Sequence, residues 1–242
     1  MKFKVISCNV FQRELEYCAG RTDAELSLEF LELGEHAHPT QLREKLQAGI
    51  DAVAAAPPQF DAVLLGYGLC GRAADGLTAR RERLVIPRSH DCCGILLGSR
   101  KKFEHYFRDM PSTPFSSPGY VEHGDYFFRD GEMMFGDGYD ALVEQYGEDN
   151  AKYIYEAMHP TLDGQLQPIY YLETPGFLFP ELRERCREHA VAEGREFKLL
   201  PGDLRLLQML LDGNWPAAEF LVLNPGETVH MRGDWDRIFT AQ

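Results

Sequence analysis

Basic residues and long apolar runs are both scarce in this sequence of 242 residues. Lysine and arginine number 25 against 38 aspartates and glutamates, so the formal net charge is -13. Such a charge repels nucleic acid and anionic membranes, and excludes them as expected partners. No run of about 18 apolar residues is present, and Met1 leads directly into a strand pattern without an apolar leader segment. We therefore expect a soluble cytoplasmic protein.

Recognisable cysteine and glycine motifs are also lacking. Six cysteines in a chain of this length are too few for a disulfide framework, and no pair has zinc-finger spacing. The glycines between Gly66 and Gly71 have the spacing of neither the dinucleotide fingerprint nor the phosphate-binding loop. A hydrophobic content of 44% is nevertheless enough for a real core. The sequence thus predicts a globular protein without a standard nucleotide motif.

Three predicted strands end close to a cysteine. Cys8 follows the strand at residues 3–7, and Cys70 follows the strand at residues 62–69. The run at residues 84–86 breaks at Pro87 and reaches Cys92 just as a helical pattern starts. An apolar strand followed by a helix is typical of a βα unit in a parallel sheet, whose carboxyl edge faces the ligand crevice. If the three strands are neighbours, the three thiols lie near one another at that edge.

The second part of the chain repeats the alternation of strands and helices. Strand patterns at residues 168–172, 196–200 and 220–223 alternate with helical patterns. We predict an α/β fold with a parallel, Rossmann-like sheet in two similar halves, residues 1–130 and 131–242. A crevice between the halves is expected to have the cysteines on one side. The turns that contain Gly176 and Gly226 would line the other side and offer main-chain groups to a cofactor.

The glycines around Cys70 have a related predicted role. Gly68 and Gly71 would let the main chain pass close to a ligand or a neighbouring strand, because glycine has no side chain to obstruct the approach. The same two glycines would direct the Cys70 thiol inward. We therefore include them among the expected cofactor-binding residues.

Cys8, Cys70 and Cys92 form the leading candidate for a metal site. Zinc accepts thiolates in tetrahedral geometry, and an iron–sulfur cluster held by three cysteines leaves one iron open. His90, Cys93, water or substrate would complete the set. Two alternatives stay open: buried thiols without a ligand role, and a nucleophilic Cys92 or Cys93 at a helix amino terminus with His90 or His38 as base.

Four further residues are candidates for acid–base work at the same rim. Glu14 lies in the first turns after the first strand, and His38 follows a strand pattern that ends at Leu33. Arg88 and His90 lie between the strand at residues 84–86 and Cys92. Histidine titrates near neutral pH, which suits it to proton transfer. An enzyme would need such groups beside an open coordination position.

Several short motifs resemble those of one family. They are Cys8-Asn9-Val10, Arg13-Glu14, His38-Pro39, Tyr67-Gly68-Leu69-Cys70-Gly71, Ile86-Pro87-Arg88-Ser89-His90-Asp91-Cys92, Leu96-Leu97-Gly98-Ser99 and Ser117-Pro118-Gly119. Together they resemble the uncharacterised domain-of-unknown-function family numbered sixteen thirty-eight. The resemblance covers nearly the whole chain. It implies an association with corrinoid methyltransferase systems, and it favours Cys92 over Cys93 as the functional thiol.

These patterns lead to an expected function. The chain would be a metal-dependent enzyme, with zinc or an iron–sulfur cluster, that transfers a group to or from a small-molecule substrate. Methyl transfer is the most specific form of this hypothesis, with a corrinoid protein as a possible partner. The competing hypothesis is a non-catalytic protein that binds a metal or corrinoid for delivery.

Overall fold

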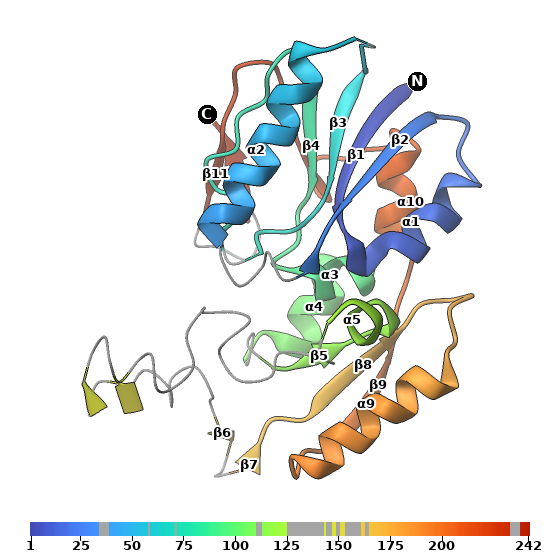
Figure 1. Cartoon of the computed structure of the whole chain (residues 1–242), viewed down its shortest axis with the longest axis vertical. Helices are drawn as coiled ribbons and strands as arrows, with labels where there is room; N and C mark the ends of the chain where they lie inside the picture. Colours follow the sequence, from blue (N-terminus) through green and yellow to red (C-terminus); the bar gives the residue numbers. More distant parts are fainter. Residues whose placement is uncertain are drawn as a thin grey trace.

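The structure is a computed structural model that describes residues 1–33, 39–57, 59–70, 72–109, 113–124, 143, 147–148, 151–152, 161–162, 165–232 and 238–242. Its main element is a five-stranded sheet in the order β10-β4-β3-β1-β2 (Figure 1). The strands are β1 (Lys2–Cys8), β2 (Glu25–Leu31), β3 (Ala62–Gly66), β4 (Arg83–Pro87) and β10 (Phe220–Leu223). β1 to β4 are parallel, and β10 is antiparallel to β4. The predicted mixed α/β fold with a mostly parallel sheet is confirmed.

The burial of the strands follows their place in the sheet. All five residues of β3 are buried, because β3 lies in the middle of the sheet and both its faces are covered. The edge strand β2 is half-buried or exposed along its length. A continuous apolar run is expected for a strand with two covered faces.

Helices cover both faces of this sheet. Gly49 of α2 (Pro39–Ala55) lies against the side chain of Ile6. Gly213, just beyond α10 (Arg205–Leu211), lies against Phe3. Residues 3 and 6 of one strand point to opposite faces, so α2 and α10 lie on opposite sides of the sheet. α1 (Gln12–Ala19) packs beside α10 (Figure 1).

A second, smaller sheet lies beyond the carboxyl edge of the first (Figure 1). Its order is β5-β8-β9, all parallel: β5 (Phe115–Ser116), β8 (Ile169–Glu173) and β9 (Phe197–Pro201). α9 (Pro180–Ala192) covers it through a small buried cluster that includes Leu182 and Cys186. Between the two sheets the chain forms η1 (Asn9–Phe11), α3 (Cys92–Leu96), α4 (Arg100–Phe107) and α5 (Pro118–His123).

The direction of β10 corrects one prediction. The strand pattern at residues 220–223 was assigned to a second parallel unit, but β10 joins the first sheet in antiparallel orientation. Four apolar residues in a row indicate a buried strand without indicating its direction or its partner. The division at residue 130 stays a prediction, although strands pair across it: β5 with β8, and β4 with β10.

The remaining strands form two hairpin-like pairs: β6 (Thr161–Leu162) with β7 (Gln165–Leu166), and β11 (Val229–Met231) with β12 (Phe239–Ala241). In the described part of the chain, no helix is both long and apolar enough to span a membrane.

Candidate functional site

Three cysteines lie at the carboxyl ends of three adjacent parallel strands. Cys8 ends β1, Cys70 lies four residues beyond β3, and Cys92 begins α3 shortly after β4. Because Ser7 pairs with Gly66, and Leu64 with Val85, the three strands end at the same level. All three cysteines are buried: Cys8 is 0%, Cys70 7% and Cys92 1% exposed. The fold thus gathers them at the carboxyl edge of the first sheet, on the side where the second sheet lies.

The loop that carries Cys70 is held against the loop that leads to Cys92. The Leu69 amide donates to the Ser89 carbonyl at 2.9 Å, and the Cys70 amide donates to the His90 carbonyl at 3.2 Å. Gly68 makes this approach possible, since a Cβ there would lie 2.6 Å from the Ser89 oxygen. Cys70 itself has a φ of 45°, a left-handed conformation that costs a non-glycine residue energy. The surrounding contacts therefore impose the position of Cys70.

Cys70 and Cys92 are in direct contact. Their sulfur atoms lie 4.0 Å apart. Burial and the neighbouring Cys92 raise the pKa of Cys8, whereas the contact with Cys92 is the main cause that raises the pKa of Cys70. Cys8 and Cys92 therefore lie within electrostatic range of each other. Without a compensating cation, these raised pKa values favour the neutral thiols of Cys8 and Cys70.

Tyr120 is a member of this cluster that the sequence patterns did not reveal. It lies on α5, is 3% exposed, and its pKa is raised by burial and then by the neighbouring Cys92 and Cys8. Gly119 sets its position, because a Cβ there would lie only 2.0 Å from the Val10 oxygen of η1. The sequence signal for this helix is Ser117-Pro118, which is typical of a helix start. In the structure the Ser117 hydroxyl caps α5 by accepting a hydrogen bond from the Tyr120 amide.

His90 has polar and aromatic partners of its own. Its Nδ1 lies 3.6 Å from the Asp91 carboxylate, and its ring stacks on Phe103 with centroids 5.6 Å apart. The interaction with the Asp91 carboxylate is the main cause that raises the pKa of His90. Asp91 also caps α3 by accepting a bond from the Gly94 amide at 3.1 Å. These contacts fix the turn that presents Cys92.

Glu14 and Arg88 are both engaged with neighbouring parts of the chain. Glu14 is 2% exposed and accepts a bond from the Thr174 hydroxyl at 3.1 Å. Burial raises the pKa of the Glu14 carboxyl. The Arg88 guanidinium donates to the main-chain oxygens of Ala217 and Phe239, so it ties down the C-terminal segment.

The two Pro-Gly turns do not face each other. Gly176 follows β8 and lies near the Tyr17 ring. Gly226 lies at the amino edge of the first sheet, where its amide donates to the Ala79 oxygen. The expected position of Gly226 opposite the cysteines is wrong, because the antiparallel direction of β10 carries its turn to the other edge. His38 and Gly71 lie outside the described residues.

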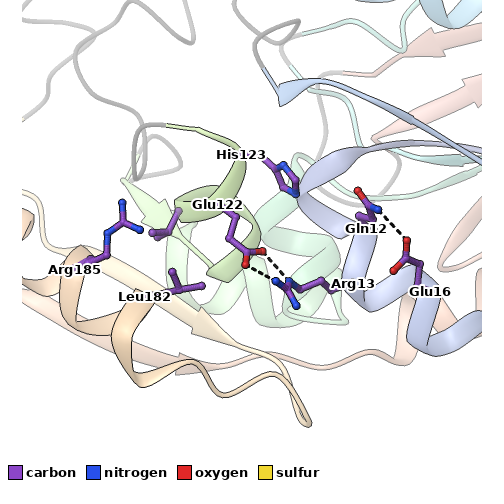
Figure 2. Close-up of a pocket in the computed structure, with 8 residues that line it drawn as sticks. Gln12, Arg13, Glu16, Glu122, His123, Leu182 and Arg185 are labelled. Carbon is purple, nitrogen blue, oxygen red and sulfur yellow. Dashed lines mark hydrogen bonds and ion pairs between the residues drawn. The ribbon is translucent and has the colours of Figure 1, made fainter.

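An open pocket of about 660 Å³ lies between α1, α5 and α9 (Figure 2). On its walls the Arg13 guanidinium makes two bonds to the Glu122 carboxylate, at 2.8 and 2.6 Å. The Gln12 amide donates to Glu16 at 2.9 Å, and His123 and Arg185 also line the pocket. α1 follows Cys8 through η1, and α5 carries Tyr120. The pocket and the cysteine cluster thus share the helix α5.

The arrangement of the donor atoms bears on metal binding. Within the described ranges, no group of three or more His, Cys, Asp and Glu side chains could hold a metal ion as the side chains stand. The Cys70–Cys92 separation of 4.0 Å nevertheless matches the roughly 3.8 Å between two thiolates on one tetrahedral zinc with bonds of about 2.3 Å. This separation would suit two thiolates on one ion, whereas Cys8 would have to turn towards them to complete such a set.

The comparison with protein families gives a direct match. The family described as "Protein of unknown function (DUF1638)" matches residues 30–211. The chain belongs to this family. The matched segment of this DUF1638 protein includes Cys70 and Cys92 but not Cys8 or Glu14. No curated protein and no solved structure matches the chain.

Proposed function

We propose that this DUF1638 protein binds one metal ion, zinc in the first instance, through Cys8, Cys70 and Cys92. The observation that carries the proposal is the convergence of three buried cysteines, two of them in contact, at one edge of a parallel sheet. Three thiolates repel one another in a buried space unless a cation is present. Binding of a cation displaces the protons of the thiols and stabilises the thiolates. The cluster has the composition of a thiolate metal site.

The strand order supports the same location. In Rossmann-like sheets, ligands bind beyond the carboxyl ends of the strands where the strand order reverses, and β1 next to β3 is such a point. We propose that the first sheet is of this Rossmann-like kind. A single ion is favoured over an iron–sulfur cluster, because thiolates on different irons lie farther apart than two thiolates on one ion.

The proposed activity is group transfer on a small molecule, with methyl transfer as its most specific form and a corrinoid protein as a possible partner. A bound zinc ion would supply Lewis acidity or activate a thiolate. The burial of the thiols would exclude water from the ion, and the Tyr120 hydroxyl would lie within electrostatic range of the thiols. The pocket between α1 and α5 is the proposed substrate site, with Arg13, Glu122 and His123 as its polar groups.

A second candidate is a protein that holds the metal without catalysis. It is favoured by the near-complete burial of the thiols, which leaves little room for a substrate beside the ion. A nucleophilic cysteine is disfavoured for Cys93, because burial raises its pKa and the nearby Asp91 carboxylate raises it further. Reactive cysteines have lowered pKa values.

Metal content tests the proposal. We expect anaerobically purified protein to contain one equivalent of zinc, colourless because zinc is d¹⁰, and we expect Cys70→Ala and Cys92→Ala to lose it. Cys18→Ala and Cys186→Ala are matched controls, because both cysteines are fully buried on helices away from the cluster. The proposal fails if the wild type contains neither zinc nor iron, or if the controls lose metal equally.

A further inference from the structure

The contact between Cys70 and Cys92 brings two thiols together whether or not a metal is bound. Their sulfur atoms lie 4.0 Å apart, about 2 Å more than the length of a disulfide bond. Two cysteines 22 positions apart in the chain are brought together by the loops that follow two neighbouring strands. The fold thus holds the two sulfur atoms as direct neighbours.

The main chain holds the two loops in this arrangement. Bonds from the Leu69 and Cys70 amides reach the carbonyls of Ser89 and His90, and Gly68 admits the close approach. These contacts hold Cys70 in its left-handed conformation. Each thiol thus meets the other at the high effective concentration of an intramolecular pair.

We infer that Cys70 and Cys92 are an oxidation site that forms a reversible intramolecular disulfide. The oxidant class is a peroxide, and Cys70 is the thiol it reaches, because Cys70 is 7% exposed and Cys92 only 1%. Because the contact with Cys92 raises the pKa of Cys70, little thiolate is present at neutral pH and the reaction with peroxide is slow. Cys92 then resolves the oxidised Cys70. Of the other four buried cysteines, Cys18 and Cys186 lie on helices α1 and α9 and take no part.

The chemistry balances with hydrogen peroxide as the two-electron oxidant. The Cys70 sulfur attacks one peroxide oxygen, the O–O bond breaks, and the products are a sulfenic acid and water. The Cys92 sulfur then attacks the Cys70 sulfur, the S–O bond breaks, and a second water leaves with the remaining proton. Two thiols lose two electrons, and a dithiol reductant reverses the reaction.

The disulfide would also control the proposed metal site. It takes two of the three proposed thiolate ligands, so the oxidised chain would have no zinc site at this edge of the sheet. This consequence rests on the proposed function. The disulfide itself does not, because it needs only the two cysteines and the oxidant.

The experiment uses the full chain, reduced and freed of metal by a chelator. The result then does not depend on whether the proposed metal site exists. After treatment with one equivalent of hydrogen peroxide, thiols are alkylated under denaturing conditions, counted and located by peptide mapping. We expect the count to fall by two from the six free thiols, with a peptide that joins Cys70 to Cys92. A dithiol should restore all six.

Variants separate this pair from other cysteines. Cys18→Ser and Cys186→Ser should still lose two thiols, whereas Cys92→Ser should form no internal disulfide. Mapping of the wild type decides the matter even if Cys92→Ser does not fold. The inference is overturned if all six thiols survive, if Cys70 is overoxidised without a cross-link, or if mapping finds Cys92 joined to Cys8 or Cys93.

Discussion

Gly68→Ala is the sharpest test of how the cysteine cluster is built. The added Cβ would lie 2.6 Å from the Ser89 oxygen and 3.1 Å from the Asp91 nitrogen. Both are main-chain atoms and cannot rotate away. A carbon needs about 3.3 Å from a carbonyl oxygen, so the two loops must separate by about 0.7 Å.

The separation weakens the two main-chain bonds between the loops. The Leu69–Ser89 bond would lengthen from 2.9 Å to about 3.6 Å, and the Cys70–His90 bond from 3.2 Å to about 3.9 Å. Two lost hydrogen bonds at about 1 kcal/mol each give a loss of about 2 kcal/mol in the free energy of unfolding. For a chain of this size, 1 kcal/mol shifts the Tm by about 2–4 °C, so we expect a fall of about 4–8 °C.

Thermal unfolding followed by circular dichroism measures this shift. Gly20→Ala is the matched control, because the nearest atom to its Cβ would be the Tyr17 oxygen at an ordinary 3.6 Å. The control should change the Tm little, since substitutions without a clash stay within about 0.5 kcal/mol. Gly68→Ala should also slow the formation of the Cys70–Cys92 disulfide. A Gly68→Ala protein with the same Tm as the wild type would refute the role assigned to this glycine.

Two further predictions concern the residues that connect the parts of the fold. Burial raises the pKa of Glu14 in the folded protein, so its stabilising contribution is present below the unfolded pKa of about 4.3 and is lost as pH rises through the folded pKa. In urea unfolding, the stability of Glu14→Gln relative to the wild type should therefore increase from pH 4 to pH 8. A stability difference that stays constant over this pH range would contradict the prediction. Arg88→Met removes the bonds to the Ala217 and Phe239 oxygens and should cost about 1–3 kcal/mol in the same assay. Arg187→Met on the exposed face of α9 serves as its control and should change stability by less than about 0.5 kcal/mol.

The sequence predicted the part of the site that local patterns determine. The patterns at residues 3–7, 62–69 and 84–86 predict strands, and the helical patterns between them indicate parallel connections. Parallel strands have a common carboxyl edge, so a cysteine just beyond each strand must lie at that edge. Local pattern and one rule of sheet geometry therefore place Cys8, Cys70 and Cys92 at one edge. The order β4-β3-β1, which makes the three strands neighbours, was decided by the tertiary structure.

Long-range contacts decided the rest, and no local pattern encodes them. The direction of β10 depends on its pairing with β4, and that pairing moved Gly226 to the other edge of the sheet. Tyr120 joined the thiols only because Gly119 lets α5 touch η1, a contact between segments more than a hundred residues apart. Gly68 is needed because the loop that carries Cys70 approaches the main chain of Ser89 and Asp91 in the other loop. The chain sequence thus determined which edge carries the thiols, whereas tertiary packing determined which side chains meet them there.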